Sequence, residues 1–293
     1  MSAVPRSSLA HFLGEAAASI FAALFPSECS ICSAPLTNIS RLPVCAECLA
    51  CVAPIAGPKC SICDQTLTIP SELSDPESRC HECTNEPPLF RRAVSYGSYE
   101  GVLRELIHLL KYRHIHPAAQ QLGRWMAEAA TPMFSSDVQN ADAESAELDP
   151  VLIIPVPLHS ARYRERGFNQ AELTARAARR NLLRLSPTRF ELEFSVLIRK
   201  RRTDSQVGMT REQRRANLRG AFTVLNKAAV RGRRILLVDD VFTTGATVSE
   251  CSRVLLAAGA GEVKVATAAR TVRTAATTYD HSMEGEAPPA ACS

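Results

Sequence analysis

Short runs of aliphatic residues between polar ones predict the strands of a buried sheet. Residues 235–238 form the clearest run, with arginines before it and aspartates after it. A strand covered on both faces shows such a continuous apolar run, which is typical of parallel sheets. Residues 151–154 show the same pattern, and residues 92–99 are predicted to be extended. We therefore expect an α/β fold whose parallel sheet begins at Val151 and is covered by helices on both faces.

The residues between these runs predict helices. One helix is expected to begin at Gly101 and to extend to Lys111, and a second to cover residues 117–130. A third begins after Asn169, which can cap it. Strands that alternate with helices are typical of a parallel sheet with helical crossovers.

Three further segments are predicted to lie outside the main core. Residues 1–26 place apolar side chains at helical spacing, which predicts an amphipathic helix that docks on the small domain or on a partner, with attachment to a membrane surface as the alternative. Residues 131–150 are acidic and poor in large apolar groups, so we expect a flexible insert. Residues 273–293 have a similar composition and are expected to form a disordered tail.

The composition is that of a soluble globular protein. The chain has 293 residues, 46% of them hydrophobic, and a net charge of +4. This length accommodates one large domain and one small one. The N-terminal apolar stretch is too short and too interrupted to span a membrane, and it is a poor signal peptide. We therefore expect a cytoplasmic protein without a transmembrane segment.

The cysteines predict metal binding. Eight of the eleven cysteines form Cys-x-x-Cys pairs, at Cys29/Cys32, Cys45/Cys48, Cys60/Cys63 and Cys80/Cys83. Each pair can direct two thiolates at one tetrahedral ion, and two pairs separated by about a dozen residues complete a closed structural zinc site. The sequence therefore predicts a double zinc ribbon over residues 27–88 that holds two Zn²⁺ ions.

Other uses of these cysteines are less compatible with the sequence. A disulfide scaffold would require secretion. A redox Cys-x-x-Cys is possible, but four copies in a loop-rich segment favour structural zinc. The pairing stays open at this point, because the first two and last two pairs can each share an ion, or the pairs can interleave.

Two acids and a loop of small residues follow the 235–238 run. Asp239 and Asp240 lie at the C-terminal end of this strand, where open α/β sheets bind their ligands. Adjacent carboxylates there can accept hydrogen bonds from a vicinal diol such as the 2- and 3-hydroxyls of ribose. The residues that follow can bind an anion through hydroxyls, a close backbone approach and the start of a helix, and they are Thr243, Thr244, Gly245, Ala246 and Thr247.

The alternative is a strand that ends in two solvated acids and a turn. For an isolated Asp-Asp pair this alternative would be preferred, but here acids, threonines and a glycine occur together, which favours a ligand site. A P-loop is excluded, because no lysine follows a glycine loop at the required spacing.

The first of two arginine-rich segments follows residues 151–154. Arg162, Arg164 and Arg166 precede a glycine and Asn169. Guanidinium groups bind phosphate oxygens through two parallel hydrogen bonds. The segment therefore indicates either phosphate binding or an ordinary basic loop capped by Asn169.

The second arginine-rich segment covers residues 199–219, between a strand that ends near Ile198 and another that begins near Ala221. It contains eight basic residues and two acidic ones. Such a segment can close over pyrophosphate or lie along a nucleic-acid backbone, and both uses require the same cations. The alternative is a solvated helix with an arginine-rich face.

Taken together, these motifs resemble the ComF family of competence-associated, phosphoribosyltransferase-like proteins. The resemblance covers roughly residues 20–272 and departs at Asp204 and Ser205, where such proteins often have prolines. The motifs that carry it, behind the double zinc ribbon, are residues 155–158, 166–170, Thr203 with Gln206, Arg214 with Asn217, residues 220–222 and residues 238–247.

The resemblance implies a type I phosphoribosyltransferase fold over residues 89–272, which binds phosphoribosyl pyrophosphate (PRPP) with Mg²⁺. It implies that the two aspartates contact ribose, that residues 243–247 hold the 5-phosphate, and that a loop containing Pro155, Val156 and Pro157 binds pyrophosphate through backbone amides. Arg166 and Asn169 are also assigned to the PRPP site. Catalytic contributions fall to Asp239, Asp240, Arg202, Thr203 and Gln206, and nucleic-acid or phosphate contacts to Arg202, Arg211, Arg214, Arg215 and Arg219.

Three functions fit these residues. The resemblance favours a PRPP-binding protein that acts in the uptake or processing of single-stranded DNA during natural transformation. An active phosphoribosyltransferase of nucleotide salvage is one alternative, and a PRPP-sensing regulator is another. A protein partner could bind through the zinc ribbons or the N-terminal helix. The acceptor substrate and the oligomeric state cannot be predicted from these residues.

Overall fold

The computed structural model describes residues 27–36, 40–70, 75–134, 149–201 and 209–272. The predicted N-terminal helix, most of the acidic insert and the tail lie outside these residues. The chain divides into two compact units between Val52 and Ala53. This boundary falls inside the 27–88 segment predicted as one zinc-ribbon domain, so the third and fourth Cys-x-x-Cys pairs belong to the unit that contains the sheet.

The described part of the first unit is small. A bridge between Glu28 and Pro35 closes the turn around its first Cys-x-x-Cys pair. The second pair begins the short helix α2 (Ala46–Ala50), where the Cys45 side chain accepts a hydrogen bond from the Cys48 amide. A thiol thus takes the place of the usual oxygen at the helix N-cap.

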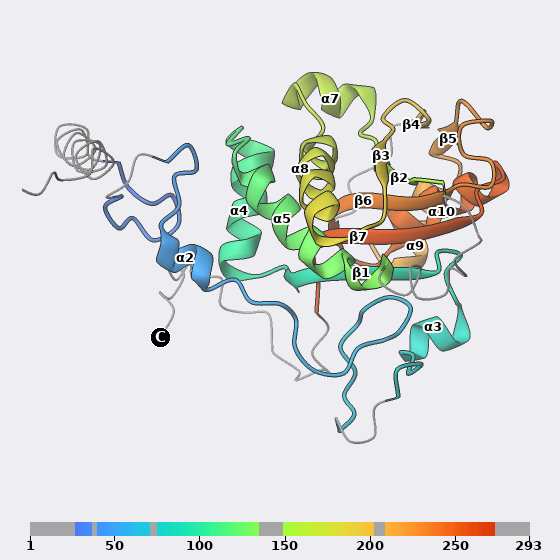
Figure 1. The fold of residues 1–293 in the computed structure, drawn as a ribbon, viewed down its shortest axis with the longest axis horizontal. Helices are drawn as coiled ribbons and strands as arrows, with labels where there is room; N and C mark the ends of the chain where they lie inside the picture. Colours follow the sequence, from blue (N-terminus) through green and yellow to red (C-terminus); the bar gives the residue numbers. More distant parts are fainter. Residues whose placement is uncertain (1–26, 37–39, 71–74, 135–148, 202–208, 273–293) are drawn as a thin grey trace, which may run out of the picture. The chain divides into compact units, whose positions relative to one another are not determined.

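The second unit is built on a five-stranded parallel sheet, with strand order β1-β7-β6-β2-β3 (Figure 1). The strands are β1 (Arg92–Ser98), β2 (Val151–Pro155), β3 (Phe190–Leu192), β6 (Arg234–Phe242) and β7 (Glu262–Arg270). A separate antiparallel pair consists of β4 (Leu197–Arg199) and β5 (Phe222–Val224). The predicted aliphatic runs are the buried central strands β2 and β6, as expected for a sheet covered on both faces.

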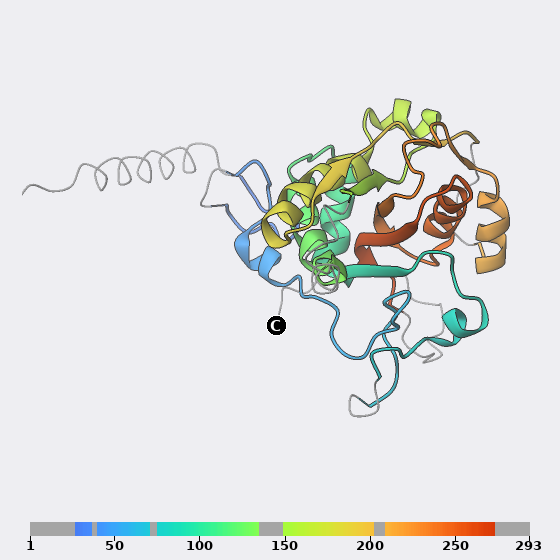
Figure 2. The same cartoon turned by 45° about the vertical axis from the view of Figure 1, so that its right-hand side comes forward.

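Helices cover both faces of this sheet. On one face lie α4 (Gly101–Tyr112), α5 (Ala118–Ala130) and α8 (Gln170–Leu185), and on the other lies α10 (Ala246–Ala257), with α9 (Arg211–Leu218) beside it (Figure 2). Two further short helices are α3 (His81–Asn85) and α7 (Ser160–Arg166). Gly123 lets α5 approach α8 closely, because a Cβ at this position would lie 2.4 Å from the Cβ of Ala177.

The sheet begins earlier in the chain than predicted. The sheet was expected to begin at Val151, but residues 92–98 already form its edge strand β1, which is parallel to β7. Polar and small residues interrupt the apolar run of β1, which hides it from a pattern search. The outer edge of β1 is covered by the chain around the third Cys-x-x-Cys pair, since the Ala93 amide donates to the Ile62 carbonyl at 2.7 Å and the Ile55 amide to the Tyr96 carbonyl at 2.9 Å.

Candidate functional site

Two carboxylates lie near the C-terminal end of β6. Successive side chains of a strand point to opposite faces of the sheet, so Asp239 and Asp240 face different helices. The side chain of Asp240 lies on the face of β6 that is covered by α4, α5 and α8, and it contacts Lys111 of α4. Asp239 follows Ile235 and Leu237, whose side chains share a core with α10. The two acids thus connect both helical layers at the edge of the sheet where ligands bind in α/β folds.

Asp240 forms a buried ion pair with a lysine that the sequence analysis did not identify. Lys111 Nζ lies 2.7 Å from Asp240 Oδ2, and their side chains are 16% and 8% exposed. Burial alone would lower the pKa of Lys111, but attraction to Asp240 and a hydrogen bond to it outweigh burial and raise the pKa. Lys111 is therefore a fixed cation beside the two carboxylates.

Asp239 has a different electrostatic environment. Burial and the neighbouring charge of Asp240 raise the pKa of Asp239 to about 7, against the opposing effects of Lys111 and Arg199. Arg199 is half-buried at the end of β4, and its pKa is lowered by burial and by the nearby Arg162. The site thus combines two acids with cations from three different elements, and one acid changes its charge near neutral pH.

The 243–247 loop connects β6 to α10 as predicted for an anion-binding turn. Gly245 is the N-cap of α10 and has φ +74°, a conformation that favours glycine. A Cβ at this position would also lie 2.6 Å from Cζ of Phe242. The Thr244 hydroxyl accepts a hydrogen bond from the Ala246 amide at 3.4 Å, and Thr243 is exposed. The loop therefore presents hydroxyl groups at the positive end of a helix dipole.

One of the predicted phosphate-binding arginines reaches this loop. The guanidinium of Arg214, on α9, donates to the Thr243 hydroxyl at 3.4 Å and to the Met209 carbonyl at 3.1 Å. α9 is oriented by a capping box, in which Thr210 and Gln213 bond each other's backbone amides. The structure thus brings together the 243–247 loop and an arginine that lies 29 residues before it.

The other arginines of the 199–219 segment are placed differently. Arg215 pairs with Glu86, and Arg219 is exposed. Arg211 is the first residue of α9. Arg202, Thr203 and Gln206 lie outside the described residues.

The predicted pyrophosphate loop at residues 155–157 needs a correction. Pro155 and Pro157 have no amide proton, and the Val156 amide donates to the Val238 carbonyl at 2.8 Å. The backbone amides of these three residues are therefore not available to pyrophosphate. Asn169 is buried and donates to the Val156 carbonyl at 3.0 Å while capping α8, so it fastens the loop in place.

The first arginine-rich segment, which the sequence left open between phosphate binding and an ordinary basic loop, is helical. Arg162, Arg164 and Arg166 lie on α7, which ends at Gly167 with φ +78°. Arg166 donates to Gln170, and its guanidinium lies over the Tyr112 ring, 5.6 Å from the centroid. Because α7 begins only a few residues after β2, its arginines lie close to the carboxyl end of the sheet.

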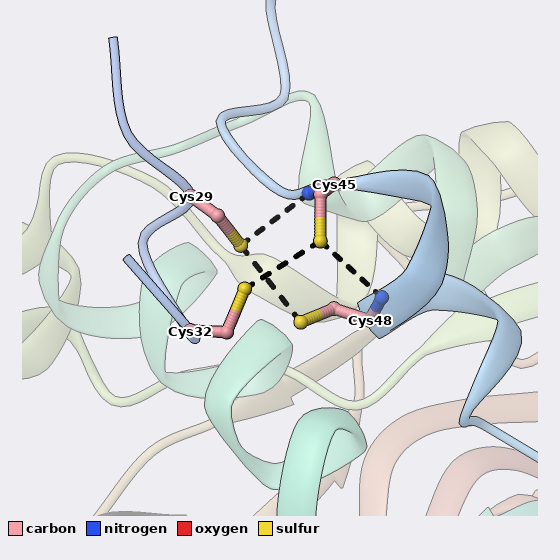
Figure 3. Close-up of side chains that lie close together, drawn as sticks. All are labelled: Cys29, Cys32, Cys45 and Cys48. Atoms are coloured by element: carbon pink, nitrogen blue, oxygen red, sulfur yellow. Dashed lines mark hydrogen bonds between the residues drawn. The ribbon is translucent and has the colours of Figure 1, made fainter. Parts of the chain in front are cut away.

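The first cysteine cluster brings together the first two Cys-x-x-Cys pairs (Figure 3). The sulfur atoms of Cys32 and Cys45 are 3.6 Å apart, and those of Cys29 and Cys48 are 3.9 Å apart. Four thiolates around zinc at about 2.3 Å would lie about 3.8 Å from one another. The Cys45 amide also donates to the Cys29 sulfur at 3.4 Å, which helps to hold that sulfur in place.

The second cysteine cluster brings together Cys60, Cys63, Cys80 and Cys83, all of which are buried. The Cys63 and Cys80 sulfurs are 3.6 Å apart. The structure thus decides between the two pairings left open by the sequence, because each cluster contains two consecutive Cys-x-x-Cys pairs. Both clusters are compatible with zinc ribbons.

Sequence reasoning missed Lys111 and Arg199 as parts of the site. A lysine in the last turn of an amphipathic helix is explained by the helix dipole alone, so Lys111 carries no distinguishing pattern. Arg199 was counted only among the charges of the basic segment. Both residues are far in sequence from the end of β6. Their proximity to it follows only from the way α4 and β4 pack in the fold.

Comparison with known proteins supports the fold and identifies relatives. The model of the phosphoribosyl transferase domain matches residues 175–286. Together with the parallel sheet and its helices, this match shows a type I phosphoribosyltransferase-like fold. Among the described residues, no helix has the length and apolar character needed to cross a membrane.

Three curated relatives align with most of the chain. DNA utilization protein YhgH of Escherichia coli O157:H7 is 33% identical over 73% of this chain and 90% of its own length. Competence protein F of Haemophilus influenzae is 29% identical over 82% of this chain and 96% of its own length. Competence protein ComFC of Bacillus subtilis is 26% identical, with coverage of 74% and 79%. Since these relatives align with most of the chain and the chain itself matches the phosphoribosyl transferase domain, this protein belongs to the ComF family of competence-associated, phosphoribosyltransferase-like proteins.

Proposed function

We propose that the carboxyl edge of the sheet binds PRPP or a closely related sugar phosphate together with Mg²⁺. The observation that carries the proposal is the position of Asp239 and Asp240 next to the 243–247 loop, with Arg214 on the Thr243 hydroxyl. Acceptors for a diol, hydroxyl donors and a guanidinium for phosphate then lie at one helix N-terminus. This combination fits ribose 5-phosphate better than it fits a solvated turn.

The residues have distinct roles in this proposal. Asp239 and Asp240 accept hydrogen bonds from the ribose hydroxyls, and the residues from Thr243 to Thr247 hold the 5-phosphate. Magnesium, which prefers carboxylate, water and phosphate oxygens, would neutralise charge on the pyrophosphate. Since the amides of residues 155–157 are not available, we assign pyrophosphate contacts to Arg162 and Arg166 of α7. Arg202, Thr203 and Gln206 are proposed to approach the same ligand.

We further propose that each cysteine cluster holds one structural Zn²⁺ ion. The sulfur separations fit tetrahedral coordination, and all eight ligands would be thiolates, as in closed structural sites. The Cys-x-x-Cys pairs come from separate turns and helix starts, so the ion would fix two distant segments in each unit. Two zinc ions per chain are the expected stoichiometry.

We propose a cellular role in the use or uptake of DNA, in line with the names of the relatives. Arg201 and Arg219, which are exposed on either side of α9, can contact phosphates of single-stranded DNA, and such binding would weaken steeply with salt. Transfer of the ribosyl group to a nucleobase is the alternative, and a sensing role for PRPP is another. Formation of a nucleotide product would favour transfer, and salt-dependent binding of single strands would favour the DNA role.

The test is a calorimetric titration of magnesium-PRPP into the zinc-loaded protein. The wild type should bind, and the Asp239→Asn, Asp240→Asn double variant should lose at least about tenfold in affinity, because two charge-assisted hydrogen bonds are removed. Arg253→Met is a matched control, since this half-exposed arginine of α10 pairs with Glu250. Absence of binding by the folded wild type would reject the proposal.

The binding should also depend on pH through Asp239. Its pKa of about 7 means that the carboxylate forms as the pH rises from 6 to 8, so affinity for the diol should rise across this range. The groups that set this pKa are Asp240, Lys111 and Arg199, with Cys251 buried nearby. By the same linkage, the raised pKa of Asp239 contributes stability to the unliganded fold that is fully present below the ordinary pKa of 3.8, declines as the pH rises above it, and is lost as the pH passes about 7.

An Asp239→Asn variant isolates this contribution. The second ionisation of a phosphate, near pH 6, is common to both proteins, so only the difference between their pH profiles reports Asp239. The wild type should gain affinity relative to the variant by up to about tenfold per pH unit below the pKa. Parallel profiles for the two proteins would contradict the assignment.

A further inference from the structure

Arg270 connects the second cysteine cluster to the 243–247 loop. It is the last residue of β7 and only 3% exposed. One Nη atom donates to the Cys63 carbonyl and the other to Gln65 Oε1 at 2.6 Å. Its guanidinium also lies over the Phe242 ring, 5.1 Å from the centroid. A buried cation is thus held by the cysteine turn on one side and by an aromatic face on the other.

Phe242 carries the contact onward to the loop. It is the last residue of β6, pairs in register with Arg270, and meets Phe90 edge to face at 6.2 Å between centroids. Its ring lies directly under Gly245, where even a Cβ would be 2.6 Å from Cζ. The position of the Phe242 ring therefore determines how the left-handed residue of the loop is seated.

Little free space separates the cluster from the loop. A cavity of about 30 Å³ lies between them and is lined by Cys63, Cys83, Phe242, Thr243, Gly245 and Arg270, among others. A water molecule needs about 10–15 Å³ of such volume. A shift of the cysteine turn by an ångström or more would therefore be transmitted to the loop. Closely packed side chains cannot absorb such a shift by deforming gradually, and they repack instead.

The cysteine turn is also fixed to the sheet. The Ser95 amide donates to Asp64 Oδ2 at 2.9 Å, and the Cys60 amide donates to the Gln65 carbonyl at 2.8 Å. Residues 60–65 therefore form one closed turn. Its first residue, Cys60, belongs to the cysteine cluster, and its last part is held to β1 through Asp64. Arg270 contacts this unit at Cys63 and Gln65, next to a proposed metal ligand.

We propose that Arg270 is a positioning residue through which metal occupancy of the second cysteine cluster controls binding at the 243–247 loop. This inference rests on the proposed sugar-phosphate site. Metal in the cluster holds the Cys63 carbonyl, the carbonyl holds Arg270, and Arg270 holds the Phe242 ring beneath Gly245. Release of the metal then loosens the loop and weakens phosphate binding.

Thermodynamic linkage distinguishes this role from one in which Arg270 only packs in the core. If metal in the cluster strengthens phosphate binding, the phosphate ligand must hold the metal more tightly by the same factor. The ligand should therefore protect one zinc ion of the chain and not the other. The first cluster belongs to a separate compact unit and serves as an internal control.

The experiment measures how zinc is distributed at equilibrium between the full chain and a chromogenic chelator, with and without ribose 5-phosphate. In the wild type, saturating ribose 5-phosphate should raise the affinity for one of the two ions by about fivefold or more, the lower end of typical couplings between sites. Calorimetry in parallel shows whether ribose 5-phosphate binds. Binding without any protection would overturn the proposal and leave the proposed function intact, and absence of binding by both ribose 5-phosphate and magnesium-PRPP would reject both.

Variants locate the coupling in Arg270. Arg270→Met should abolish the protection and weaken ribose 5-phosphate binding, Arg270→Lys should retain part of both, and the control Arg253→Met should leave both unchanged. The single tryptophan, Trp125, is buried in the same unit and reports whether each variant is folded. If Arg270→Met does not fold, the wild type and Arg270→Lys decide. Full protection in a folded Arg270→Met protein would overturn the role of Arg270.

Discussion

Replacing Cys60 by serine should unfold the unit that contains the sheet. The four cysteines of the second cluster share a core with Phe90 and with residues of β2, β6 and β7. Structural zinc contributes about 10–16 kcal/mol in small zinc-binding peptides, whereas a whole domain is stable by about 5–15 kcal/mol. Loss of this ion is therefore comparable to the total stability of the unit.

The measurement is urea denaturation followed by the fluorescence of Trp125, which is stacked on Tyr96 of β1 at 5.3 Å between ring centroids. The Cys60→Ser protein should be unfolded or have a strongly lowered midpoint, and it should bind one zinc ion fewer. The matched control is Cys29→Ser in the first cluster, which should also lose one zinc ion but leave the Trp125 transition in place. Equal midpoints for Cys60→Ser and the wild type would show that the second cluster is not structural.

The sheet could be predicted from sequence because its central strands are unbroken apolar runs. Burial on both faces forces such runs, as residues 235–238 show. β1 was not assigned to the sheet, since Ser95 and Gly97 interrupt its pattern and its burial depends on segments elsewhere in the chain. The edge strand is defined by tertiary contacts that local propensity does not record.

Some residues of the candidate site could likewise be predicted from the sequence, and others depend on tertiary contacts. Asp239, Asp240 and the 243–247 loop are consecutive in sequence, so their spacing alone indicates a ligand site. Lys111 comes from a helix more than a hundred residues earlier, and its role depends on how α4 packs on the sheet. The assignment of residues 155–157 failed for a local reason, because two prolines and one amide committed to the sheet leave no donors.

Replacing Lys111 by methionine should destabilise the second unit by about 3–5 kcal/mol. Methionine keeps the length and the apolar stem but leaves the buried carboxylate of Asp240 without its cation, and breaking a buried pair in this way typically costs that amount. In this variant Asp240 can instead take up a proton. With its usual pKa, protonation at pH 7 costs about 4 kcal/mol, which sets an upper bound on the loss of stability. Protonation costs less at lower pH, so the loss should be smaller at pH 5.

The Lys111→Met, Asp240→Asn double variant separates the ion pair from the packing of the lysine. If the cost of Lys111→Met arises from an uncompensated charge, the double variant should recover most of the stability, as measured by Trp125 fluorescence in urea. Equal losses in the single and double variants would instead indicate lost packing. Lys111 also lowers the pKa of Asp239. As long as Asp240 stays ionised, Lys111→Met should therefore move the pH at which sugar-phosphate affinity rises to a value above 7. The ion pair thus connects the stability of the sheet edge with the pH at which its carboxylates can accept a ligand.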